Sequence, residues 1–180
     1  MLQITVPSTE IWDEVNQEFI SIKGQTLQLE HSLVSISKWE SKWHKSFLHT
    51  REKTDEQIFD YIKCMTINKD INPVVYRCLT ADNVKEINDY INNPMTATCF
   101  NNNGNGKKNN EVVTSELIYY WMIALNIPVE FQKWHINRLM TLIRVCEIKN
   151  NPPKKMGRGE LMRRNAALNA SRRKQLNTKG

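Results

Sequence analysis

The sequence has no apolar run long enough to cross a membrane. Its longest uninterrupted apolar stretch is LIYYWMIAL, residues 117–125, which is nine residues long, whereas a transmembrane helix needs about 20. No membrane-spanning segment and no membrane partner are therefore predicted. The chain also shows no secretory signal ahead of its cysteines, so we expect a protein of the cytoplasm.

Paired metal-binding residues are lacking as well. Cys64, Cys78, Cys99 and Cys146 form no CxxC motif, and the four histidines form no paired metal-binding motif. Structural and catalytic metal sites usually announce themselves by such pairs. We expect reduced, mostly buried thiols, hydrogen-bonded core or interface roles for His44, His49 and His135, no metal and no cofactor.

Signatures of catalysis are also absent. There is no GxSxG motif and no nucleophile signature around any cysteine. Gly104 and Gly106 lie near Lys107 and Lys108, but the GK[ST] ending of a phosphate loop and the strand before it are missing. The sequence therefore predicts a protein that is not an enzyme.

What the sequence does have is a strongly uneven charge. The net charge is +6, and from Lys149 onward the chain carries ten Lys and Arg residues against one acid. The tail contains no aromatic residue for base stacking. It is predicted to bind phosphates of nucleic acid or an acidic protein surface, with a solvated terminus without a dedicated partner as the alternative. The candidate residues are Lys154, Lys155, Arg158, Arg163, Arg164, Arg172, Arg173 and Lys174.

The first residues alternate between apolar and polar side chains, as half-buried strands do. Ile20 and Ile22, followed by Leu27 and Leu29, flank the segment Lys23-Gly24-Gln25. This pattern predicts a β-hairpin that turns at residues 23–25.

From Ser32 onward the apolar spacing becomes helical. Ser32, Thr54 and either Thr80 or Asp82 are suited to be helix N-caps. Residues 112–125 are apolar on nearly every side, which predicts a central helix at the hub of the core, and a second helix is expected from Pro128 through Ile148.

These patterns predict an α+β fold that is mainly helical, with a short N-terminal antiparallel β-hairpin and a basic C-terminal helix that protrudes. We expect one domain over residues 1–150, with the hairpin in 1–31, and a tail over 151–180. Residues 101–110, NNNGNGKKNN, are expected to form a mobile loop because they offer no apolar face.

Trp39 and Trp43 are the main aromatic feature of the segment SKWESKWHK, residues 37–45. On a helix they share a face with Leu33 and Ile36, because residues three or four apart are neighbours. The pair is predicted to close the protein's own core or to hold a partner, and the lysines around it are predicted to form a solvated rim.

Three segments resemble a group of uncharacterised proteins of tailed bacteriophages: ISKWESKWHKSFL at 36–48, ELIYYWMIALNIPVEFQKWHINRLMTLIRVCEIKN at 116–150, and RRNAALNASRRKQLNTKG at 163–180. The group is similar to phage tail assembly chaperones. The resemblance implies a non-enzymatic morphogenesis factor of the host cytoplasm that binds the tape-measure protein, or another virion assembly protein, while the tail is built.

Two other functions stay open beside the chaperone. One is a structural virion protein of the head-tail connector or tail terminus. The other is a nucleic-acid-binding protein that acts through the basic tail. Self-association into a homo-oligomer is compatible with each of them.

Overall fold

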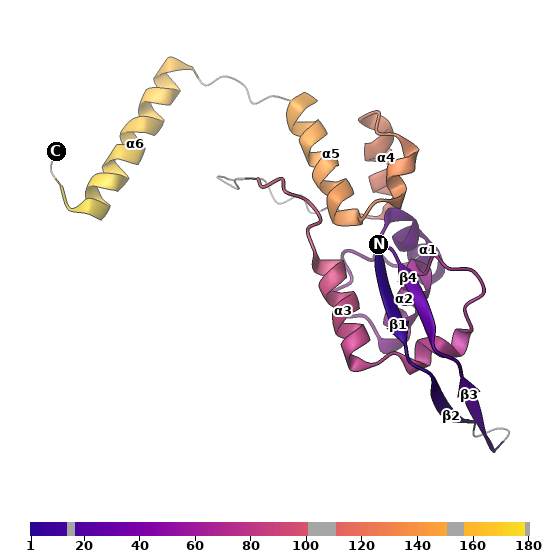
Figure 1. Ribbon diagram of the computed structural model, residues 1–180. Coiled ribbons are helices and arrows are strands. Elements are labelled where there is room, and N and C mark those ends of the chain that lie inside the picture. Colours follow the sequence, from indigo (N-terminus) through magenta and orange to yellow (C-terminus); the bar gives the residue numbers. More distant parts are fainter. Residues whose placement is uncertain (14–16, 101–110, 151–156, 179–180) are drawn as a thin grey trace. The chain divides into compact units, whose positions relative to one another are not determined.

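The computed structural model describes residues 1–13, 17–100, 111–150 and 157–178 (Figure 1). The chain divides into two compact units, Met1–Cys146 and Glu147–Gly180, whereas the predicted boundary was after residue 150. The first unit combines short antiparallel strands with helices, and the second contains a long helix. The predicted α+β, mainly helical class is thereby confirmed.

The N-terminal strands form one long hairpin that is divided into two ladders. β1 (Leu2–Val6) pairs with β4 (Gln25–Leu29), and β2 (Thr9–Asp13) pairs with β3 (Glu18–Ile22). The register is continuous, from Leu2 opposite Leu29 to Asp13 opposite Glu18. The chain thus reverses between β2 and β3, and the predicted turn at residues 23–25 is wrong.

Gly24 explains why residues 23–25 resembled a turn. A Cβ atom at this position would lie 3.0 Å from both the Ser8 nitrogen and the Val6 oxygen. Only a residue without a side chain allows the two backbones to approach this closely. The glycine therefore marks the interruption between the two ladders, where the strands stay paired on either side.

The apolar face of the β1/β4 ladder contributes to the core. Ile4, Val6, Leu27 and Leu29 are buried, in alternation with more exposed neighbours, as expected for a strand pair with one face in the core. The other edge of β4 is covered by the chain around residues 66–68, where the Ile67 amide donates to the Gln28 carbonyl over 2.9 Å. This cover protects an edge that would otherwise be open to pairing.

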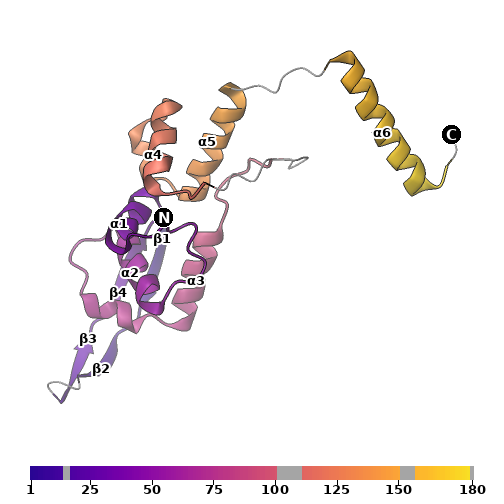
Figure 2. The same ribbon diagram turned by 180° about the vertical axis from the view of Figure 1, so that it is seen from behind.

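The next helices begin where the sequence predicted their caps. They are α1 (Leu33–Trp43), α2 (Asp55–Met65), the 3-10 helix η1 (Pro73–Cys78) and α3 (Ala81–Asn92). Each α-helix starts with a reciprocal capping box, formed by Ser32 with Ser35, Thr54 with Gln57, and Thr80 with Asn83. Among these helices α1 packs on α2, and α3 packs on β1 (Figures 1 and 2).

The following segment differs from the prediction in two ways. α4 covers Ser115–Ala124, but it is not the hub of the core, because Tyr120 and Ile123 are exposed. The helix predicted from Pro128 is interrupted: η2 (Val129–Lys133) is a 3-10 helix, and α5 (Ile136–Asn150) begins only after it. Trp134 has extended backbone between them.

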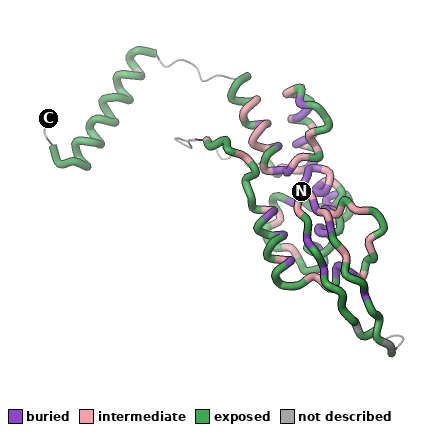
Figure 3. The backbone as a smooth tube through the Cα atoms, in the orientation of Figure 1, coloured by how far each residue is buried: buried purple, intermediate pink, exposed green. Residues whose placement is uncertain are grey.

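α6 (Arg158–Leu176) is the predicted basic C-terminal helix. All of its side chains that the structure describes are exposed (Figure 3). It ends at Asn177, whose positive φ of 50° is the left-handed conformation typical of helix C-termini. The segment 101–110 lies outside the described residues.

Candidate partner-binding surfaces

Trp39 is part of the core. Its side chain is 0% exposed, and its indole N–H donates to the Gln57 carbonyl over 2.9 Å. The ring also packs edge-on against Phe47, with centroids 5.2 Å apart. The partner-binding role predicted for Trp39 is therefore corrected: the side chain has no surface to offer and instead joins α1 to α2.

Trp43 lies at the edge of the same interface and is half-buried. Its indole N–H donates to the Asp60 carboxylate over 3.0 Å, and the Lys42 ammonium group forms an ion pair with the other carboxylate oxygen. Lys42 and Lys38 are exposed, as predicted for the rim. The described contacts of Trp43 are internal, so a partner contact through its remaining surface stays a prediction.

Asp60 holds a charge at this interface despite its burial. Burial alone would raise the pKa of the carboxyl group, but the hydrogen bonds from Lys42 and Trp43 outweigh it and lower the pKa. The carboxylate therefore stays ionised and links the end of α1 to the middle of α2.

Glu40 lies on α1 and is buried. Its carboxylate binds the loop after α1 and the start of α4. One carboxylate oxygen accepts a hydrogen bond from the Phe47 amide, and the other accepts one from the Ser115 amide, each over 2.7 Å. Ser115 is the first residue of α4, where a negative charge is favoured by the helix dipole. The bidentate contact thus positions α4 against α1, and no pattern in the sequence had indicated it.

A second buried network follows the end of β4. The Tyr90 hydroxyl donates to the Glu30 carboxylate over 2.6 Å, and the His31 Nδ1 atom lies 2.5 Å from the Tyr61 hydroxyl. The rings of His31 and His135 meet edge to face, with centroids 5.0 Å apart. His135 as a core histidine agrees with the sequence prediction, whereas His31 had given no signal, because its partners are far away along the chain.

Both histidines are neutral and structural. Burial, followed by the proximity of His135, lowers the pKa of His31 to about 3. Burial also lowers the pKa of His135. The His135 Nε2 atom contacts the Tyr90 carbonyl over 3.0 Å and must donate, while Nδ1 accepts the Asn137 amide over 3.3 Å. Both ring nitrogens of His135 are therefore occupied, which leaves neither available as a general base.

A cleft of about 210 Å³ lies beside this network. Glu30, Lys133, Trp134, His135 and Arg138 contribute to its lining. The Arg138 guanidinium group stacks 4.0 Å from the Trp134 ring centroid, a cation–π contact. The cleft is open and charged, and its histidine is already engaged in hydrogen bonds through both ring nitrogens.

Exposed apolar side chains occur on α4 and at the tip of the hairpin. Tyr120 is 63% and Ile123 74% exposed, and at a spacing of three residues they are neighbours on the helix. At the other end of this unit Trp12 and Phe19 are exposed and pack edge to face, 4.9 Å between centroids. Both pairs are apolar surfaces that a partner could bind.

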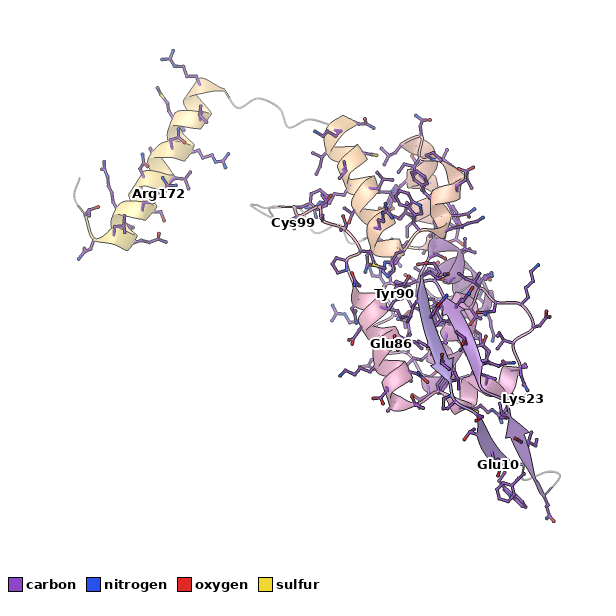
Figure 4. All side chains as sticks on the ribbon, viewed as in Figure 1. Glu10, Lys23, Glu86, Tyr90, Cys99 and Arg172 are labelled. Atoms are coloured by element: carbon purple, nitrogen blue, oxygen red, sulfur yellow. The ribbon has the colours of Figure 1, made fainter. Side chains whose placement is uncertain are left out.

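Six of the basic residues that were predicted to bind a partner lie on α6. Arg158, Arg163, Arg164, Arg172, Arg173 and Lys174 are exposed on this helix. Figure 4 labels Arg172 among them. Lys154 and Lys155 lie outside the described residues.

Chemically specialised clusters are not seen in the described residues. No group of three or more His, Cys, Asp or Glu side chains there could hold a metal ion. All four cysteines are free thiols; Cys64, Cys78 and Cys146 are half-buried, whereas Cys99 is exposed (Figure 4). The expectation of mostly buried thiols is therefore wrong, because none of the four is fully buried.

Comparison with protein families, with characterised proteins and with solved structures finds no match for this chain. Among the described residues, no helix combines the length and the apolar character that a bilayer crossing requires.

Proposed function

We propose that this protein is a non-enzymatic tail assembly chaperone of a bacteriophage, which binds the tape-measure protein, or another virion assembly protein, in the host cytoplasm. The resemblance of three of its segments to phage proteins motivates the assignment. The observation that carries it in the structure is the exposed pair Tyr120 and Ile123 on α4, which lies within the resembling segment 116–150.

The exposure of this pair is unusual for its chemistry. Single exposed apolar residues are common on protein surfaces, but adjacent large ones on a strongly apolar helix indicate a contact surface. The opposite side of α4, with Ile118 and Met122, is buried. α4 is thus held by the core on one side and offers an isoleucine and a tyrosine on the other, to which the apolar face of a helical client could bind.

We place the client contact on α4 rather than on the two tryptophans of α1. The sequence left Trp39 and Trp43 either as core or as a partner contact, and in the folded chain Trp39 is fully buried and Trp43 is engaged with Asp60. The proposed contact is therefore Tyr120 and Ile123, and substitutions of Trp39 would affect the client only by unfolding the protein.

The test is co-expression of the full chain with the tape-measure protein, followed by affinity capture. The wild-type chain should retain the client, and Tyr120→Ser with Ile123→Ser should lose most of it. Ile67→Ser is the matched control, since Ile67 is also an exposed apolar side chain, and it should leave capture unchanged.

Two results would reject the proposal. One is a chain that never captures the tape-measure protein although it is folded. The other is recovery of the chain as a regular component of purified virions by mass spectrometry, because a chaperone leaves the finished particle and a structural subunit stays.

A further inference from the structure

We propose that α6 binds double-stranded DNA as a helix lying in the major groove, with its cations on the phosphates of both groove walls and without sequence selectivity. This inference goes beyond the proposed chaperone function. It rests on the second unit of the chain, whereas the proposed client contact lies on α4 in the first unit.

The first observation is how the cations are distributed around α6. Its basic residues fall at positions 158, 163, 164, 172, 173 and 174. At about 100° per residue, no sector of the helix wider than about 80° lacks a cation. A helix lying on a flat acidic surface would use one side only, whereas a helix inside a groove meets phosphates on two sides.

The second observation is the lack of a continuous apolar face. Leu161, Met162, Leu168 and Leu176 are exposed, and at the same angular step they fall within one sector of about 120°, which also contains Arg158, Arg172 and two side-chain amides. A membrane-surface helix needs a continuous apolar face, and a helix docked in a protein groove buries its apolar anchors. Because charged and amide side chains interrupt the apolar sector of α6, electrostatic attraction must supply most of the binding energy.

The third observation is the chemistry between the cations. Apart from the leucines and the methionine, the residues between the cations are mostly small or carry side-chain amides, such as Asn165 and Asn169, with Glu160 as the single acid of the helix. The absence of aromatic rings removes the stacking contacts on which single-strand binders depend. The major groove of B-form DNA, about 12 Å wide, admits an α-helix, and the small alanines keep this one slender.

The helix also has the dimensions for this contact. Its 19 residues span about 28 Å, which is less than one turn of the duplex at about 34 Å. Contacts to about six phosphates would make the affinity fall about 10³-fold between about 50 mM and about 200 mM salt, because bound cations release counterions.

The experiment measures binding of the full-length protein to fluorescent duplexes of about 20 base pairs, in two unrelated sequences, by anisotropy at both salt concentrations. Both duplexes should bind equally, with the steep salt dependence given above. Arg163→Ala with Arg164→Ala should reduce the logarithmic salt slope by about two and weaken binding at least tenfold at low salt. Lys69→Ala with Lys85→Ala removes the same charge from exposed positions of the first unit and should change neither.

A second variant separates a groove-bound helix from mere charge. Ala167→Pro keeps every cation but breaks the helix near its centre, and it should weaken duplex binding at least tenfold. Ala167→Ser keeps the helix and a small side chain and should bind like the wild type. Equal affinity of Ala167→Pro and wild type would overturn the groove-bound helix.

Three further outcomes would reject the inference. Absent or salt-insensitive duplex binding, equal losses in the Lys69/Lys85 control, or tighter binding to polyglutamate than to the duplex would each reject the inference. The last result would assign α6 to an acidic protein surface instead. None of these outcomes bears on capture of the tape-measure protein, so the two proposals fail separately.

Discussion

The first unit and α6 differ in how their side chains are packed. In the first unit the large apolar side chains of α1 and of the β1/β4 ladder are buried, and no buried side-chain nitrogen or oxygen among the described residues lacks a hydrogen-bond partner. In α6 every described side chain is exposed. Helices of this length without packing are only marginally stable in water.

Mutations in the two regions should therefore affect different measured properties. Substitutions in the first unit remove tertiary contacts and should lower the free energy of unfolding. Substitutions in α6 remove no buried contact and should alter binding and local helicity instead.

Trp39→Ala should destabilise the first unit most. It leaves a large cavity between α1 and α2 and removes the indole hydrogen bond to the Gln57 carbonyl, so we expect a loss of about 3–5 kcal/mol in the free energy of unfolding. Urea denaturation followed by circular dichroism measures it. Trp12→Ala is the matched control, because Trp12 is 47% exposed and its cross-strand pair with Phe19 contributes about 1 kcal/mol or less.

Glu40→Ala should have the next largest effect. It removes the acceptor of two buried amides, those of Phe47 and Ser115, and we expect a loss of about 3 kcal/mol. Glu86→Ala, at an exposed position of α3, should change the unfolding free energy by about 0.5 kcal/mol or less. Equal effects of the two variants would show that Glu40 does not position α4.

Acid should destabilise the first unit through His31. Its pKa is about 3 in the folded chain and about 6.5 when unfolded, so between these values only the unfolded chain binds the proton. The contribution of His31 to the free energy of unfolding is therefore fully present at pH values above its unfolded pKa, and it is lost as the pH falls below that value. From about pH 7 to about pH 5 we expect His31 to account for a loss of about 2 kcal/mol.

Urea denaturation of His31→Gln at the same two pH values checks this assignment. The variant should lose most of the pH dependence, with a smaller part left to His135, whose pKa is lowered in the same direction. His44→Asn alters an exposed histidine with positive φ, which asparagine tolerates, and should keep the wild-type slope. An unchanged slope in His31→Gln would contradict the neutral buried histidine.

The smallest effect on folding is expected from α6 itself. Ala167→Pro should reduce far-ultraviolet helicity while it changes the unfolding free energy of the first unit by about 0.5 kcal/mol or less. A large loss of stability would mean that α6 contributes to the folded body, and the separation of the two regions would be wrong.

Local features of the fold were predictable from the sequence, and pairings were not. The caps Ser32, Thr54 and Thr80 were readable because each acts on a residue three positions later. Alternation in the first 31 residues indicated which side chains face inward, but it does not say which strands pair. Gly24 therefore looked like a turn, although it permits a close approach of two backbones.

The candidate sites divide in the same way. The exposed cations of α6 followed from composition. The spacing of Trp39 and Trp43 predicted that they share a helical face. That Trp39 is fully buried and Trp43 only half-buried depends on how α2 packs against α1. The apolar composition of α4 suggested a central helix. Composition alone does not show that one side of the helix has no packing neighbours. His31 and Glu40 were missed since their partners are distant in sequence.

Native-state hydrogen exchange of the full chain, with and without duplex DNA, tests the central contrast most directly. Core amides such as those of β4 and α1 should exchange only through global unfolding in both samples, while α6 amides should exchange nearly as fast as an unstructured chain and slow markedly when DNA is added. Strong protection of α6 without DNA, or the same fast exchange with it, would contradict the account.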